Sequence, residues 1–381
     1  MNRILSLRVS DAVVLLTFTS LCFPTLALIQ LGSSVLFPHY FTVAIAIPVL
    51  FVLRPWTLRP VLPVLGMILL SSALSVNTVS IPIAVFHSLH LMAIALLAGV
   101  PGGLPLRFAK ATVIIYAILL LLTQILVAIG QGGLVEGLLV QREGLTAIRA
   151  SGFATEPSYA AMILLILSRF VIVCDVDWFG TRRLALVLGA LLASLSLFAL
   201  IAAVLILAMY LLERSNMRAM LTVLVGGIVM LVGMSLTEFF ADRLMLMDMS
   251  EGWMGMGSGT IRLLPYLYLA DVLSENPWPL FVGAGAGKLE PIFFQDVGRY
   301  YTMHSQLTTH MAGPLYDYGF LAILPVLLLW NRPRGLVARA LFISMAVLVM
   351  LNTGFGTYLF ILFGVFALLE QKHRSSQSCT E

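Results

Sequence analysis

The chain has 381 residues, of which 60% are hydrophobic and only 10% are charged, and its formal net charge is +4. Soluble domains carry roughly 25% charged residues, so this composition excludes an ordinary soluble domain. The charges stand in short groups between apolar runs, so the net charge is better explained by position along the chain than by nucleic-acid binding. Because a membrane-spanning helix needs about 20 apolar residues, the sequence predicts one all-α, polytopic transmembrane domain over residues 1–381.

The predicted elements begin with six apolar runs in the first half of the chain. The first run is too long for a typical signal peptide, so we expect it to remain as a helix. The six predicted helices cover Asp11–Ile29, Val35–Leu53, Val61–Val76, Pro82–Gly99, Ala111–Gly130 and Pro157–Val173.

The next apolar run, from Leu184 to Leu212, is long for one spanning helix and short for two. We predict a hairpin of two short helices that turns near Ser194–Ser196, because this keeps the arginines on both sides of the run on one side of the membrane. The remaining predicted helices cover Ala219–Leu236, Ala312–Trp330, Leu336–Asn352 and Thr357–Leu369. The prediction is therefore about twelve transmembrane helices.

The basic residues predict the orientation of these helices. With the amino terminus in the cytoplasm, the basic connections all fall inside and the carboxyl terminus is also cytoplasmic, as the positive-inside rule expects. These connections hold Arg54 and Arg59, Arg107 and Lys110, Arg182 and Arg183, Arg214 and Arg218, and Arg332, Arg334 and Arg339. Two longer segments then lie in the periplasm: 131–156, and a long loop over 237–311 before the last three helices. Their aromatic and aliphatic residues predict packed structure instead of disorder.

The first candidate for a chemical role lies where the shorter periplasmic segment re-enters the membrane. Proline suits the first turn of a helix, so Pro157 marks the helix start, where free N–H groups form an anion site. Arg149 and Glu156 flank this start, and Ser158 follows it. The alternative is a capped helix end with a surface ion pair of little energetic weight.

The second candidate is a glycine run in the long loop, Gly283-Ala-Gly285-Ala-Gly287-Lys288, which follows Arg262. It is not a phosphate loop of the Walker type, because Val282 and Leu289 stand where that motif needs Gly and Ser or Thr. The glycines either permit tight turns or let backbone approach a ligand.

The third candidate is His304, which His310 and the pair Tyr318-Gly319 follow. Histidines six residues apart do not share a helical face and no third ligand is obvious, so no metal site is predicted. The pKa of histidine suits proton transfer near neutrality.

Three ionisable residues inside the predicted spans are weaker candidates. His87 and His90 are one helical turn apart, and such groups usually face a bundle interior. Arg169 lies near the cytoplasmic end of its helix, where we expect its charged head to reach the membrane surface.

Taken in order, these segments resemble bacterial polysaccharide polymerases of the O-antigen (Wzy) type, which are related to the O-antigen ligases. The matching residues are Arg149-x-x-Gly152-x-x-x-Glu156-Pro157-Ser158, then Arg262 with Asn276-Pro277 and Gly283-x-Gly285-x-Gly287, then His304-Ser-Gln-Leu with Tyr318-Gly319. Ser305 departs from the ligase pattern, which more often has Asn after the histidine.

The resemblance implies an inner-membrane enzyme of O-antigen, capsule or exopolysaccharide assembly. Its donor and acceptor would be oligosaccharides on undecaprenyl pyrophosphate, with a flippase and a chain-length regulator as partners and without a metal, a cofactor or nucleic acid. Arginine stabilises a departing pyrophosphate well, because its planar guanidinium group donates two parallel hydrogen bonds to a phosphate. The implied substrate-binding residues are Arg149, Arg262, Lys288, Arg243, Arg299 and Ser158, and the implied catalytic residues are His304 as general base and Glu156.

Two alternatives remain open at this point. An O-antigen-type ligase would use the same donor and transfer the glycan to a lipid or protein acceptor. A secondary transporter is less favoured, because transport sites normally lie at mid-membrane and the charged candidates lie mostly in external segments.

Overall fold

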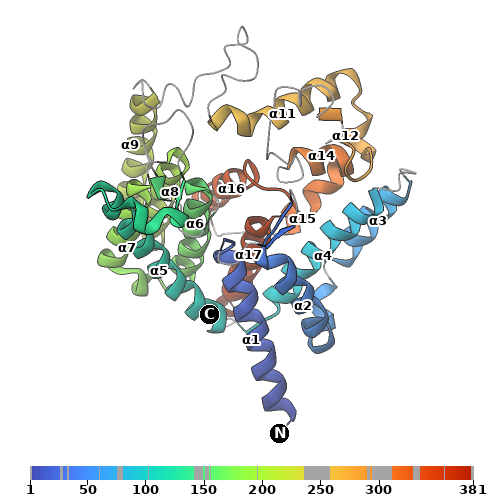
Figure 1. Cartoon of the computed structure of the whole chain (residues 1–381), viewed down its shortest axis with the longest axis horizontal. Coiled ribbons are helices and arrows are strands. Elements are labelled where there is room, and N and C mark those ends of the chain that lie inside the picture. Colours follow the sequence, from blue (N-terminus) through green and yellow to red (C-terminus); the bar gives the residue numbers. More distant parts are fainter. Residues whose placement is uncertain are drawn as a thin grey trace.

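The computed structural model describes residues 2–25, 29–31, 34–59, 61–74, 80–101, 103–140, 149–150, 154, 156–194, 196–235, 258–289, 292–293, 311–328, 335–355 and 357–378. These residues form a helical bundle with two short antiparallel strand pairs (Figure 1). The helices of the first half are α1 (Asn2–Cys22), α2 (Pro38–Leu53), η1 (Pro55–Leu58), α3 (Leu62–Leu74), α4 (Ser80–Ala98), α5 (Gly103–Ala128), η2 (Gly132–Leu138) and α6 (Pro157–Cys174). Those of the second half are α7 (Val176–Ala193), α8 (Leu197–Glu213), α9 (Met217–Ser235), α11 (Ser258–Glu275), α12 (Trp278–Val282), α14 (Ala312–Tyr318), η5 (Gly319–Ala322), α15 (Ile323–Leu328), α16 (Leu336–Met350) and α17 (Tyr358–Ser378). The strands are β1 (Ile29–Leu31), β2 (Ser34–Leu36), β3 (Leu139–Val140) and β4 (Arg149–Ala150).

Proline explains where the first two helices differ from their predicted bounds. The prediction that the first helix runs to Ile29 is wrong, since α1 ends at Cys22 and Pro24 follows. A residue before proline is disfavoured in the helical region, which stops the helix there. Ile29 instead pairs with Leu36 in the β1–β2 ladder, and α2 begins at Pro38. The predicted start at Pro157 is confirmed, with Glu156 as the extended N-cap residue of α6.

The predicted hairpin break is present at Ser194–Ser196. Ser194 is the C-cap of α7, and Ser196 is the extended N-cap of α8. The carboxylate of Asp177, near the start of α7, lies 3.0 Å from the guanidinium of Arg214, just after α8. The two helices therefore run antiparallel.

The prediction of one helix over Ala312–Trp330 is wrong, because the chain breaks at Gly319. Gly319 has φ 59° and separates α14 from η5 and α15. A Cβ atom at this position would lie 2.5 Å from the carbonyl oxygen of Leu280 and 2.8 Å from that of Pro279. The break thus lets α12 approach the backbone of η5 more closely than any side chain would permit.

Part of the long loop predicted over 237–311 is helical. It contains α11 and α12, and α11 packs against α14. Tyr268 of α11 contacts Phe293 edge to face, with ring centroids 5.1 Å apart, and Ala312 joins this second small core. The described part of the loop is therefore packed, as its aromatic content predicts.

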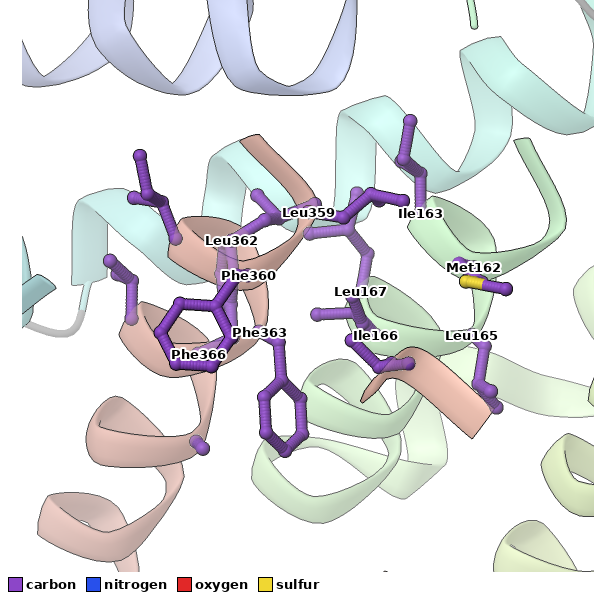
Figure 2. Close-up of a cluster of buried hydrophobic side chains, with 14 of the residues drawn as sticks. Met162, Ile163, Leu165, Ile166, Leu167, Leu359, Phe360, Leu362, Phe363 and Phe366 are labelled. Atoms are coloured by element: carbon purple, nitrogen blue, oxygen red, sulfur yellow. The ribbon is translucent and has the colours of Figure 1, made fainter. Parts of the chain in front are cut away.

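Helix α17 lies at the centre of the bundle and contacts α1, α4 and α6 (Figure 1). Figure 2 shows how α6 and α17 meet through buried side chains, with Phe363 of α17 beside Ile166 and Leu167 of α6. Phe170 of α6 also meets Phe366 edge to face at 4.9 Å. Each such side chain stabilises the packed state by about 1.5–3 kcal/mol relative to water exposure, and less relative to lipid.

One end of the bundle gathers basic residues, and we call it the cationic end. It is marked by Arg54, Lys110, Arg183, Arg214, Lys372 and Arg374. The helices α2, α4, α6 and α17 all point their carboxyl ends toward it. Lys110 donates a 2.5 Å hydrogen bond to Asp175, which lowers the pKa of that carboxyl below its ordinary value.

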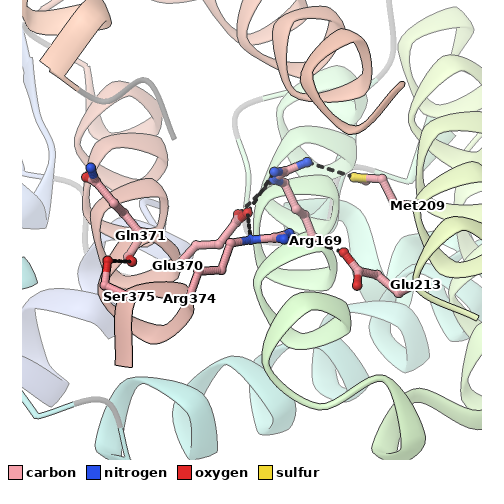
Figure 3. A network of polar contacts seen from close by, with 7 residues as sticks. All are labelled: Arg169, Met209, Glu213, Glu370, Gln371, Arg374 and Ser375. Atoms are coloured by element: carbon pink, nitrogen blue, oxygen red, sulfur yellow. Dashed lines mark hydrogen bonds and ion pairs between the residues drawn. The ribbon is translucent and has the colours of Figure 1, made fainter. Parts of the chain in front are cut away.

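The side chain of Arg169 is buried inside the bundle, so the prediction that it reaches the surface is wrong. Its side chain is 5% exposed and donates two hydrogen bonds, of 2.9 and 2.8 Å, to the carboxylate of Glu370, which is 2% exposed. Figure 3 shows that Arg374 also reaches Glu370 and continues to Glu213. The network ties α6, α8 and α17 together at the cationic end.

Within the described residues, three helices are long and apolar enough to cross a membrane: α4 over Ile81–Ala98, α5 over Gly103–Ala128 and α6 over Pro157–Cys174. Five shorter apolar helices accompany them: Val9–Cys22, Pro38–Leu53, Leu197–Glu213, Met217–Met230 and Leu336–Met350. Long apolar helices in a helical bundle suggest a membrane protein.

Candidate functional site

The end of the bundle opposite the cationic end carries aromatic and histidine side chains, and we call it the aromatic end. It holds the amino ends of α2, α4, α6 and α17. Its residues are Glu156, Ser158, Tyr159, Tyr358, His39, Tyr40, Phe86, His87, His90, Phe355 and Tyr318.

At the start of α6, Glu156 and Ser158 contact each other. The buried Ser158 hydroxyl donates to Oε2 of the half-buried Glu156 at 3.1 Å, so the carboxylate is oriented by a short local contact. The N–H of Tyr159 donates to the Glu156 carbonyl at 3.0 Å and is not available to a ligand. Pro157 has no N–H. The helix start thus offers fewer backbone donors to an anion than its sequence suggested.

From this helix start, ring contacts lead to the amino end of α2. Tyr159 meets the ring of Tyr358 edge to face with centroids 6.2 Å apart, and its hydroxyl donates to the carbonyl of Asn352. The Tyr358 ring lies 5.6 Å from that of His39, which in turn lies 4.1 Å from the ring of Tyr40. Residues of α2, α6 and α17 therefore share one contact chain.

Three histidines are buried in this contact chain: His39, His87 and His90, each at most 3% exposed. The ring of Tyr40 lies 6.2 Å from that of His90, whose Nδ1 atom donates to the carbonyl of Phe86 at 2.7 Å. The Nδ1 atom of His87 lies 2.8 Å from the hydroxyl of Tyr318.

Several polar atoms of this cluster lack a hydrogen-bond partner within the described part of the chain: both ring nitrogens of His39, Nε2 of His87, Nε2 of His90 and Oγ of Ser88. Unpaired polar groups are costly in a low-dielectric interior, so these atoms call for water or a polar ligand. Among the residues described, no group of three His, Cys, Asp or Glu side chains is arranged to hold a metal ion.

The glycine run binds a carboxylate of its own chain. Asp317, 4% exposed, accepts hydrogen bonds from three consecutive backbone N–H groups, those of Gly287 at 2.7 Å, Lys288 at 3.0 Å and Leu289 at 3.3 Å. Such successive N–H groups form an anion-binding concavity. Here the anion is internal, so the backbone of this segment is not available to a phosphate.

The glycines of this run are needed for the close approach. Gly283, Gly285 and Gly287 all have positive φ, at 77°, 95° and 73°. A Cβ atom on Gly283 would lie 2.5 Å from the carbonyl oxygen of Asp317, and one on Gly287 would clash with the Ile83 side chain. Of the two roles considered for these glycines, the structure supports tight turns and close backbone packing.

The remaining predicted site residues are placed only in part. The side chain of Lys288 is half-buried beside the Asp317 contact. The backbone of Arg149 pairs with Val140 in the β3–β4 ladder, and the backbone of Arg262 lies in α11. His304, Arg243 and Arg299 lie outside the described residues.

The structure therefore links Glu156 and Ser158, through the tyrosine and histidine contacts, to Tyr318 and its neighbour Asp317. Sequence reasoning missed His39 and Asp317. A signal was present for each, because both are polar side chains within or beside a strongly apolar predicted span.

The chain was also compared with protein-family models, with curated proteins and with solved structures, and no match was found in any of the three comparisons.

Proposed function

We propose that this chain is a multi-pass protein of a bacterial inner membrane that polymerises undecaprenyl-pyrophosphate-linked oligosaccharide repeat units at the periplasmic face. About twelve crossings, with both termini in the cytoplasm, belong to this proposal. The clustering of basic residues at one end of the bundle supports it, because basic residues collect on the cytoplasmic side. The aromatic end would then face the periplasm.

The observation that carries the proposal is the contact chain from Glu156 to Tyr318. The Glu156-Pro157-Ser158 segment and the Tyr318-Gly319 segment are far apart in sequence, and both belong to the resemblance, which implies that they lie on one side of the membrane. In the structure both lie at the aromatic end, and the ring contacts between them run through Tyr358, His39, Tyr40, Phe86 and His87.

In this proposal, the acceptor sugar hydroxyl attacks the anomeric carbon of the donor glycan, and the pyrophosphate carrier leaves. Arg149 and Arg262 would bind the pyrophosphate, with Lys288, Arg243 and Arg299 contributing positive charge. His304 would accept the proton of the attacking hydroxyl. Glu156, held by Ser158, would orient the acceptor or an arginine.

The test is complementation of a deletion strain with Glu156→Gln, which keeps the acceptor for the Ser158 hydroxyl and removes the charge. We expect a loss of long-chain glycan of roughly 100-fold, the size of effect that mispositioned reactants produce. The matched control is Glu275→Gln on α11, an exposed carboxylate, with equal protein levels verified by immunoblot. Normal chain length in the Glu156 variant would remove this residue from the site.

A secondary transporter is the second candidate, and the broken helix at Gly319 favours it. Discontinuous helices beside buried ionisable groups form substrate sites in many transporters, and the break lies next to the His87–Tyr318 contact. Uptake of a solute into proteoliposomes that depends on His87, together with a normal glycan profile in the deletion strain, would select this candidate. A ligase would instead leave long chains on the carrier lipid.

A further inference from the structure

A pocket of about 510 Å³ lies near the cationic end, between η1, α3, α4, α15 and α17. Its walls are apolar and include Val64, Leu91, Ile94, Ala95 and Leu368. The volume falls within the roughly 300–1,000 Å³ that is typical of small-molecule sites. An apolar wall of this kind suits a hydrocarbon chain.

Lys372 lines this pocket, and Arg54 lies beside it, hydrogen-bonded to the lining residue Gly99. Nζ of Lys372 donates to the carbonyl of Ala98 at 2.5 Å, and a guanidinium nitrogen of Arg54 donates to the carbonyl of Gly99 at 2.8 Å. These carbonyls end α4, where the helix dipole favours positive charge. Both side chains keep further N–H donors, since an ammonium group has three and a guanidinium group has five.

Neither cation forms an ion pair with an acidic side chain in the part of the chain that the structure describes. The carboxylate of Glu370 on the same helix is taken by Arg169 and Arg374. Partial burial and the nearby charge of Arg54 lower the pKa of Lys372. Two adjacent positive charges thus stand here, and a bound anion would offset the repulsion between them.

We propose that this pocket binds an anionic phospholipid of the bilayer, with an acyl chain along the apolar walls and the phosphate at Arg54 and Lys372. Trp56, 61% exposed, also lines the pocket, and an indole ring suits the membrane–water interface. Basic pockets between helices on the cytoplasmic side bind anionic headgroups by this chemistry. The proposal depends on membrane insertion and not on the glycan reaction.

The experiment measures lipid binding to the purified full chain by native mass spectrometry, with phosphatidylglycerol and phosphatidylcholine compared at equal concentration. We expect the wild-type chain to retain phosphatidylglycerol preferentially. The variant Arg54→Gln/Lys372→Gln should bind it roughly 30-fold more weakly, from the contribution of each basic residue to anionic-lipid attraction. The control Arg107→Gln/Arg182→Gln removes the same charge from exposed residues that do not line the pocket, and its binding should be unchanged.

A second variant tests the apolar part of the site and guards against misfolding of the first. Ala95→Leu narrows the pocket without changing charge and should also weaken phosphatidylglycerol binding. If Ala95→Leu or the double variant Arg54→Gln/Lys372→Gln unfolds, phosphatidylglycerol binding is compared between the wild-type chain and Lys372→Gln alone. The proposal would be overturned by equal losses of phosphatidylglycerol binding in the pocket variant and the control variant, or by no preference for phosphatidylglycerol over phosphatidylcholine. It would also be overturned if inorganic phosphate and phosphatidylglycerol raised the unfolding temperature of the chain equally.

Discussion

The Nδ1 atom of His87 lies 2.8 Å from the hydroxyl oxygen of Tyr318, and this contact joins the long helix α4 to the short helix α14. Both side chains are at most 1% exposed. The contact therefore connects the buried histidine cluster to the segment that ends at the Gly319 break.

This pair should be energetically coupled. In a double-mutant cycle with His87→Leu and Tyr318→Phe, we expect a coupling free energy of about 0.5–1.5 kcal/mol, the range of a buried hydrogen bond between helices. Unfolding of the four proteins in mixed micelles gives the value. Strictly additive losses would mean that the two side chains contribute independently.

Removal of the Asp317 carboxylate should destabilise the fold, because three backbone N–H groups would lose their acceptor together. We expect Asp317→Ala to lower the free energy of unfolding by about 2–4 kcal/mol. Asp271→Ala, an exposed carboxylate on α11, is the control and should change stability by less than about 0.5 kcal/mol. A similar small change in both variants would contradict an anchoring role for Asp317.

Two glycine substitutions should act in opposite directions. Gly283→Ala forces a side chain into a backbone conformation open almost only to glycine and toward the Asp317 carbonyl, so we expect a loss of at least about 2 kcal/mol. Gly189 lies in α7 with open space around it, so Gly189→Ala should stabilise the chain by up to about 1 kcal/mol. Thermal unfolding of both variants side by side measures the contrast, and a tolerated Gly283→Ala would refute the close packing of this loop.

The buried ion pair at the cationic end should be costly to break from one side. Arg169→Met leaves the buried Glu370 carboxylate with Arg374 as its remaining cationic partner. We therefore expect the free energy of unfolding to fall by about 3–5 kcal/mol. The double variant Arg169→Met/Glu370→Met should lose less than the sum of the single variants, because no uncompensated carboxylate remains. Asp177→Asn, which breaks the exposed pair with Arg214, should have almost no effect. An Arg169 variant as stable as the Asp177 variant would show that the pair is unimportant.

Much of the helical framework follows from the sequence, because apolar run length and proline position act locally. The start of α6 at Pro157 and the break at Ser194–Ser196 were predictable for this reason. The break at Gly319 was not, since it depends on contact with the carbonyls of Pro279 and Leu280, about forty residues earlier in the chain. Long-range contacts of this kind leave no periodic pattern in the sequence.

The candidate site was predictable only in outline. The Glu156-Pro157-Ser158 segment could be identified from its chemistry, and the structure places it at one end of the bundle with Tyr318. The role of Asp317 could not be predicted, because nothing in its neighbouring residues indicates that the glycine run would fold around it. Arg169 was misassigned because its partner, Glu370, is 201 residues away in the sequence.

Deletion of this gene, with surface glycan and lipid-linked intermediates analysed by gel electrophoresis and mass spectrometry, tests the proposed polymerase activity most directly. If the chain is the polymerase, we expect single repeat units, either on the final lipid acceptor or accumulating on undecaprenyl pyrophosphate, and no long chains. An unchanged glycan profile would contradict the polymerase proposal, and so would long chains that are still built on the carrier lipid.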